Sequence, residues 1–279
     1  MAFALVGTFS LQQTAQAQET DDPQAQFEEL QETFERGAQA AQAENKDLAY
    51  DLLTEAHEMA IELEQEGARE QIEDILQRVP RQWGNEALQA ENYEEAIEHF
   101  EKGIEVAPEN AYMPYGKGLA LFNLDRDEEA VDAMIESLET AREVGDGSQL
   151  STTEERLHDH YISRASNLLS AENPTTDDAN QALSYLDDLE EHLNPSPDAF
   201  FFRATAYFAL GDYQDAITSA DQGLELFDGS ASDEAQFHFV KGESQFELGN
   251  LSDACATFEN ATFGDYQARA EHYLEHECE

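Results

Sequence analysis

The chain has 279 residues, of which 41% are hydrophobic and 10% aromatic, enough apolar material for a large buried core. It holds 62 Asp and Glu against 14 Lys and Arg, a formal net charge of -48 that disfavours nucleic acid as a partner because phosphates would be repelled. Self-repulsion of this size destabilises a compact state in dilute buffer, and at about 1 M salt the Debye length of about 3 Å removes most of it. The composition therefore predicts a protein from a halophilic host, and an ordinary acidic protein or a cation sponge is the alternative.

The N-terminal residues 1–20 are expected to be a truncated signal peptide. Their apolar run is followed by the small-x-small pattern Ala15-Gln16-Ala17, but no Lys or Arg precedes it. If the signal is real, the protein is extracytoplasmic, either periplasmic or secreted, and otherwise it is cytoplasmic. No stretch is long and apolar enough to predict a transmembrane segment. Residues 21–29 are expected to form a polar linker.

Beyond the linker, apolar residues follow a helical period to the end of the chain. The expected order is one helix pair, an extra helix at 68–79, two tandem units, a loop at 145–149, an irregular pair with an inserted turn, and two more units. A final helix within 265–279 is expected to cap the array. The repeat array is predicted at residues 30–268, with units at about 30–63, 77–110, 111–144, 155–196, 197–230 and 235–268.

Two of these units keep the same register over 34 residues, a period typical of helical repeats. Gly84 and Ala96 of one unit correspond to Gly118 and Ala130 of the next. Such a register predicts an all-α fold: a right-handed α-solenoid of antiparallel helix pairs with a C-terminal capping helix.

Turn residues support this fold. Gly211 and Gly249 stand where the first helix of a pair must stop, a position that favours the left-handed conformation. Asp212 and Asn250 follow as expected N-caps, and Asn92 with Glu95 is expected to form a capping box.

The pattern resembles that of tetratricopeptide repeats, in which small residues at the eighth and twentieth positions let the two helices approach closely. The resemblance covers about six repeats. The pairs that fill these two positions are Gly37 with Ala49, Gly84 with Ala96, Gly118 with Ala130, Ala204 with Ala216 and Gly242 with Ala254. The resemblance implies a non-enzymatic scaffold for protein–protein interaction, without a cofactor.

Basic residues recur immediately before the eighth position, at Arg36, Lys117, Arg164, Arg203 and Lys241. One hypothesis is that each cation lays its stem on the helix interface and pairs with a carboxylate of a neighbouring helix. The alternative is that basic residues are simply common at this position.

By the same resemblance, the concave groove is lined by four positions of each first helix. The candidate groove residues are Arg78, Arg81, Asn85, Tyr112, Tyr115, Asn123, Asp198, Phe201, Thr205, Gln236 and Phe239, with Gln89, Leu119, Glu243 and Glu247 in the same register. An aromatic groove in so acidic a chain suits a peptide or protein with basic and apolar residues. The alternative is that Tyr115, Phe201 and Phe239 only pack between helices.

Other chemistry-bearing residues give weaker signals. His272 and His276 lie four apart on the last helix and face one side, but no third ligand of matching spacing accompanies them, so a solvated pair is favoured over a metal site. No catalytic arrangement and no phosphate-binding loop stand out. Cys255 and Cys278 are a candidate disulfide that would fasten the capping helix.

The sequence therefore predicts a scaffold that binds a peptide or protein partner in the groove of the solenoid. The alternatives are an acidic structural or regulatory protein of a halophile without a groove ligand, or a non-catalytic subunit of an envelope enzyme complex. The oligomeric state is not encoded in any motif.

Overall fold

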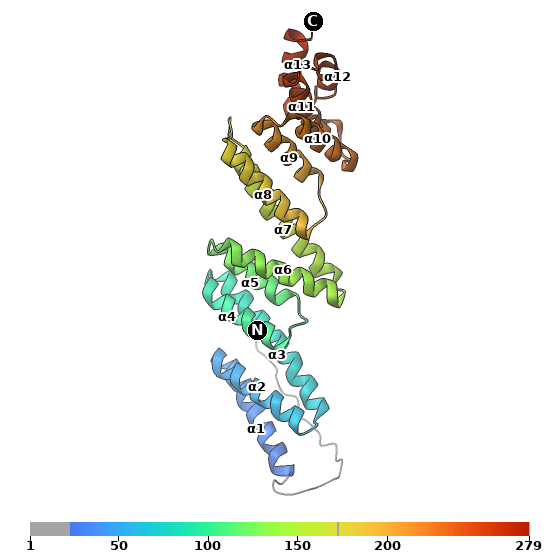
Figure 1. The fold of residues 1–279 in the computed structure, drawn as a ribbon. Coiled ribbons are helices and arrows are strands. Elements are labelled where there is room, and N and C mark those ends of the chain that lie inside the picture. The colour runs from blue at the N-terminus through green and yellow to red at the C-terminus, as the bar shows by residue number, and fades with distance from the viewer. Residues whose placement is uncertain (1–22, 172, 279) are drawn as a thin grey trace. The chain divides into compact units, whose positions relative to one another are not determined.

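The computed structural model describes residues 23–171 and 173–278, and within them it contains thirteen α-helices, one short 3-10 helix and no strand (Figure 1). The expected all-α solenoid of paired helices is therefore present. The expected signal peptide at 1–20 lies outside the described residues. The chain divides into two compact units, and the boundary between Thr153 and Glu154 falls inside α7.

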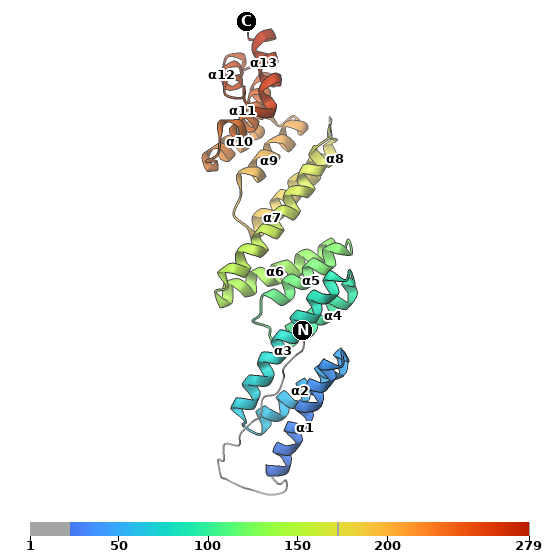
Figure 2. The same cartoon turned by 180° about the vertical axis from the view of Figure 1, so that it is seen from behind.

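The first unit consists of three consecutive helix pairs and the beginning of α7. Neighbours in sequence pack side by side, as the views from front and back show (Figures 1 and 2). Its helices are α1 (Pro23–Gln42), α2 (Lys46–Glu62), α3 (Glu66–Gln89), α4 (Tyr93–Val106), α5 (Tyr112–Asn123), α6 (Asp127–Val144) and the start of α7 (Gly147–Leu169). The extra helix expected at 68–79 merges with the next one, so α3 is continuous through the buried Pro80.

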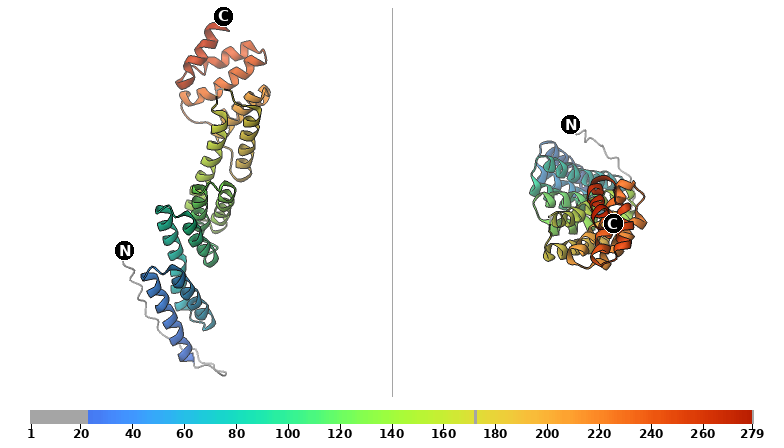
Figure 3. Two further views of the ribbon diagram at one scale, coloured as in Figure 1. Left: turned by 90° about the vertical axis from the view of Figure 1, so that its left-hand side faces the viewer. Right: turned by 90° about the horizontal axis from the view of Figure 1, so that it is seen from above.

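The second unit continues the pairing and ends with the capping helix. At its C-terminal end, α11, α12 and α13 lie against one another (Figure 3). Its elements after α7 are α8 (Thr176–His192), α9 (Pro197–Leu210), α10 (Tyr213–Leu226), α11 (Ala231–Glu247), α12 (Leu251–Glu259), the 3-10 helix η1 (Gly264–Tyr266) and α13 (Gln267–His276).

Small residues create the close helix contacts that the repeat pattern predicted. The ring of Phe100 on α4 is fully buried, and a Cβ added to Gly84 on α3 would lie only 2.6 Å from its Cζ. A Cβ on Gly242 would lie 2.7 Å from Phe258, and one on Gly118 would lie 2.9 Å from Met134. Each glycine therefore makes room for the large side chain on the second helix of its own repeat.

The turns that follow α9 and α11 share one geometry. Gly211 and Gly249 adopt φ values of 83° and 77°, as expected for a left-handed residue that ends a helix. The next amide in each case bonds back five residues, from Asp212 N to Tyr207 O and from Asn250 N to Gln245 O, both at 2.9 Å. Four earlier turns adopt the same conformation with an acidic residue instead of glycine, at Glu44, Glu64, Glu91 and Asp125.

Several helix starts differ from the sequence-based expectations. The expected linker at 21–29 is wrong from residue 23 onward, because α1 begins there and buries Phe27 and Leu30. The expected loop at 145–149 is also too long. Asp146 Oδ1 accepts hydrogen bonds from the backbone amides of Ser148 and Gln149, so α7 already begins at Gly147.

The residues expected to cap helices are at N-cap positions, but their side chains do not make the expected hydrogen bonds. Asn92, Asp212 and Asn250 are N-cap residues, yet none of them accepts a capping hydrogen bond with its side chain. A complete capping box occurs instead at the start of α8, where Thr175 and Asp178 bond each other's backbone amides.

Candidate functional site

Three of the recurrent cations connect successive repeats through ion pairs. Lys117 on α5 lies 2.7 Å from Glu101 on α4, and Lys241 on α11 lies 2.5 Å from Asp221 on α10. Arg203 on α9 contacts two carboxylates of α8, as described next. Arg164 is half-buried and also interacts with its surroundings, whereas Arg36 is exposed and forms no ion pair with the described residues.

Among Lys117, Arg203 and Lys241, the side chain of Arg203 is the most buried. Its side chain is 13% exposed, and it lies 2.7 Å from Asp187 and 2.8 Å from Glu190. Burial opposes its charge, but the two carboxylates outweigh burial and raise the pKa of Arg203. For Lys117, Arg203 and Lys241 the predicted pairing with a neighbouring helix is therefore confirmed, and these cations act as structural links.

Four predicted groove residues of the first unit come together between α3 and α5. The guanidinium carbon of Arg81 lies 3.9 Å from the centre of the Tyr112 ring. The hydroxyl of Tyr112 donates a hydrogen bond of 2.7 Å to Asn85 Oδ1. The rings of Tyr112 and Tyr115 are 5.9 Å apart. We call Arg81, Asn85, Tyr112 and Tyr115 the Tyr112 cluster.

The Tyr112 cluster is partly buried and partly accessible. Arg81 is exposed, while Asn85, Tyr112 and Tyr115 are half-buried, so the cluster has both a fixed base and an accessible surface. Tyr112 also packs edge-on against the buried Phe100, at 6.3 Å between ring centres, which holds it in place. The Asn85 amide nitrogen makes no hydrogen bond to the described residues, so its two N–H groups remain open to a ligand.

The other groove candidates of the first unit stand apart from this cluster. Arg78 is exposed and lies 3.5 Å from Asp74 on its own helix. Asn123 is exposed and donates its amide to the backbone carbonyl of Leu119, also on its own helix.

In the second unit the candidates are dispersed and one of them is covered. Asp198 is exposed, Gln236 is half-buried, and Thr205 bonds the carbonyl of Phe201 on the same helix. Phe201 is half-buried, with its ring 5.8 Å from that of Phe237.

Phe239 is wrong as a groove residue because it is only 1% exposed. The capping helix covers it: its ring lies 5.2 Å from that of Tyr266 and 6.2 Å from that of Tyr273, and the guanidinium of Arg269 sits 4.1 Å from its centre. At this position the alternative of packing between helices is the correct one.

The same covering helix creates a cleft of about 650 Å³ beside α11. Glu243 and Phe246 of α11 line one side, and α13 lines the other. Glu243 is 15% exposed at its side chain, and its Oε1 accepts hydrogen bonds of 3.3 Å from Arg269 Nη2 and from the hydroxyl of Tyr273. Burial raises the pKa of Glu243, although both neighbours act in the opposite direction. Burial and the adjacent carboxylate also raise the pKa of Tyr273 to about 12.

Comparison with known families settles what kind of repeat this is. A tetratricopeptide repeat model matches residues 81–143, 177–231 and 203–270, which together make up more than half of the chain. The chain belongs to the tetratricopeptide repeat family. The family's fold is a scaffold for protein interaction. The matched residues include the Tyr112 cluster and four residues that line the cleft between α11 and α13, namely Glu243, Phe246, Ala268 and Arg269.

Two solved structures with this repeat are similar at a low level. One is a tetratricopeptide repeat protein from Parabacteroides merdae, with 13% identity, a TM-score of 0.33, and coverage of 89% of this chain and 98% of that chain. The other is the TPR2AB domain of yeast Sti1 in complex with an Hsp90 peptide, with 15% identity, a TM-score of 0.32, and coverage of 89% and 95%. No curated protein matches significantly. The family assignment rests on the repeat model and on the helix packing.

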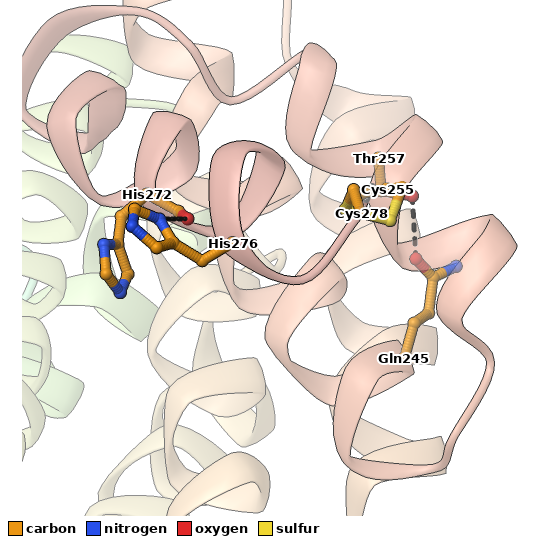
Figure 4. The surroundings of a disulfide bond; sticks show 6 residues. All are labelled: Gln245, Cys255, Thr257, His272, His276 and Cys278. Carbon is orange, nitrogen blue, oxygen red and sulfur yellow. Dashed lines mark hydrogen bonds between the residues drawn. A yellow bond between two sulfur atoms is a disulfide. The ribbon is translucent and has the colours of Figure 1, made fainter.

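His272 and His276 lie near the C-terminal end of this repeat protein, close to the two cysteines (Figure 4). His276 Nδ1 lies 3.0 Å from the backbone carbonyl of His272, both side chains are exposed, and the described residues supply no third metal ligand beside them. Cys255 on α12 and Cys278 after α13 form a disulfide with an S–S distance of 2.02 Å. The disulfide therefore fastens the wall of the cleft to the last repeat.

The sequence did not single out the cleft. Glu243 stood in the groove register, but Arg269 and Tyr273 belong to the capping helix, and nothing in their spacing shows that this helix turns back over α11. Among the described helices none has the length and apolar character that crossing a bilayer requires.

Proposed function

We propose that this tetratricopeptide repeat protein is a non-enzymatic scaffold that binds a segment of a partner protein, rich in basic and apolar residues, at the Tyr112 cluster. The observation that carries the proposal is the convergence of four groove-register side chains from two successive first helices. The hydrogen bond from Tyr112 to Asn85 and the stacking of Arg81 fix the cluster before a ligand arrives. A preformed surface loses less side-chain entropy on binding.

The chemistry of the cluster suits an extended backbone next to an apolar side chain. The open amide of Asn85 donates to a peptide carbonyl, and the rings of Tyr112 and Tyr115 offer apolar area with a small entropy cost. The net charge of -48 attracts basic segments over the distance that salt permits.

Selection from a random peptide library on the full chain tests this proposal. The selection is carried out at 1 M KCl, where attraction of any cation to the surface is screened. We expect a selected peptide to lose at least tenfold in affinity with Asn85→Ala or Tyr115→Ala. The matched control is Asn180→Ala, an exposed asparagine on α8. Equal affinities for the Asn85 and Asn180 variants would contradict the proposal.

We also propose that the protein works outside the cytoplasm of a salt-adapted cell. The disulfide supports an oxidising compartment, and the apolar run followed by Ala15-Gln16-Ala17 supports export. Alkylation of intact cells before lysis, followed by mass spectrometry, tests this: we expect Cys255 and Cys278 to be protected, and labelled thiols would refute it.

A second candidate function is an acidic structural or regulatory protein without a groove ligand, or a non-catalytic subunit of an envelope complex. It is favoured by Phe239, whose place in the groove register is filled by the chain's own capping helix. Failure to select any peptide on the wild-type chain would favour this second candidate.

A further inference from the structure

The cleft between α11 and α13 contains the Glu243 carboxylate, and only one of its two oxygens accepts hydrogen bonds from the described residues. Arg269 and Tyr273 both donate to Glu243 Oε1, and no described residue donates to Oε2. A half-buried carboxylate gains most from donors on both of its oxygens, because each bond offsets lost hydration. A hydrogen-bond donor from a ligand would therefore stabilise the Glu243 carboxylate most at Oε2.

The walls of the cleft suit a flat cation. Phe246 and Tyr273 stand with their ring centres 5.4 Å apart, and Glu277 adds a second carboxylate to the lining. Arg269 is the only Lys or Arg in the lining, and its side chain is 59% exposed. A positively charged group thus finds aromatic surface and carboxylates together in one cleft of about 650 Å³.

The protein's own arginine shows which cation fits. The guanidinium of Arg269 lies at once on Glu243 Oε1 and over the ring of Phe239, at 3.3 Å and 4.1 Å. A guanidinium is planar, carries donors in a fork that matches a carboxylate, and stacks on aromatic rings, whereas an ammonium is a strongly hydrated point charge. The environment therefore favours arginine over lysine.

We propose that the α11–α13 cleft is a specificity site that holds one arginine side chain of a partner protein, with its guanidinium on Glu243 Oε2 and its stem packed against Phe246 and Tyr273. This inference rests on the proposed peptide-binding function and adds a requirement for arginine. The disulfide between Cys255 and Cys278 supports the site because it fixes the helix that forms one wall.

The experiment uses a peptide selected on the full chain and replaces each of its arginines in turn with citrulline, which keeps the shape but removes the charge. Affinities are measured at 1 M KCl for the wild type, for Glu243→Gln and for Glu225→Gln. The last variant removes the same charge from an exposed position on α10 and serves as the control.

We expect one arginine whose replacement weakens binding at least tenfold in the wild type and in the Glu225 variant, but less than twofold in Glu243→Gln. Coupling of this kind assigns the contact to the carboxylate. If no arginine is coupled to Glu243 while binding still depends on Asn85, the arginine site is overturned and the proposed function stands. If replacement of that arginine by lysine leaves affinity unchanged, the preference for a guanidinium is overturned. Loss of binding in both glutamate variants to the same extent would reveal general charge attraction and also overturn the site.

Discussion

The sharpest consequence of the helix packing concerns Gly84. The ring of Phe100 is fully buried, with Gly84 of α3 on one side and Gly116 of α5 on another, where an added Cβ would lie 2.5 Å from the ring. At Gly84 a Cβ would meet three ring atoms at 2.6, 2.7 and 2.9 Å. Phe100 thus has no free side toward which to move, and Gly84→Ala is expected to force a shift of whole helices.

Two opposing terms decide the magnitude. Replacing glycine with alanine inside a helix stabilises by about 1 kcal/mol, whereas overpacking a close-packed core costs about 1–3 kcal/mol. Because Phe100 is confined by Gly116, we expect the upper part of that range and a net loss of about 1–2 kcal/mol. Gly67 lies on the same helix with nothing within 4 Å of an added Cβ, so Gly67→Ala is the matched control and should gain up to about 1 kcal/mol.

The assay is urea unfolding followed by the fluorescence of Trp83. This is the only tryptophan of the chain, and it is buried beside Gly84, so it reports on the first unit. Adding Phe100→Leu to Gly84→Ala should recover part of the loss, because the smaller side chain leaves room for the methyl group. If Gly84→Ala stabilises as much as Gly67→Ala, the close contact with Phe100 does not constrain the fold and the reasoning fails.

Four further predictions concern the disulfide of the cap, the pH dependence of two side chains, and salt. The disulfide closes a loop with a sequence separation of 23, so Cys255→Ser with Cys278→Ser should cost about 3 kcal/mol and abolish hydrogen-exchange protection in α13; unchanged protection would contradict this. Burial lowers the pKa of His99, so on acidification the unfolded chain binds a proton at His99 at a higher pH than the folded chain does. The first unit should therefore lose stability as the pH falls below about 6.5, and urea midpoints that stay level from pH 7.5 to 5.5 would refute this. Burial raises the pKa of Glu243, so its contribution to stability is present at low pH and is lost as the pH rises above about 4.5. Glu243→Gln should remove this loss of stability, and parallel plots of stability against pH for variant and wild type would count against it. Finally, the unfolding midpoint should rise with KCl up to about 1 M because screening relieves a net charge of -48, and a midpoint independent of KCl would reject adaptation to salt.

The helix pairs could be predicted from the sequence because the features that specify them are local. The small residues at Gly84, Gly118 and Gly242, and the glycines that end α9 and α11, express backbone and steric requirements that a fixed register repeats. Helix starts were less predictable: Asp146 caps α7 where a loop was expected, because a short Gly-rich stretch suits either state.

The basic residues before the eighth repeat position show how much of the ion pairing the repeat register predicts. Their position before the small residue predicted pairing with a neighbouring helix, and Lys117, Arg203 and Lys241 confirm it. Arg36 occupies the same position without an ion pair to the described residues, since α1 has no earlier described helix to supply the carboxylate.

The sequence by itself determined the repeat and its small-residue contacts, because these depend on spacing along one helix or between helices joined by a short turn, and the candidate groove positions followed from the resemblance to the family. Only the tertiary structure decided which of those positions remain accessible. Tyr112 and Asn85 meet because α3 and α5 lie side by side, whereas Phe239 is covered and Glu243 is enclosed because α13 folds back over α11. Burial and electrostatic environment arise from such contacts between elements, and spacing along the chain does not encode them.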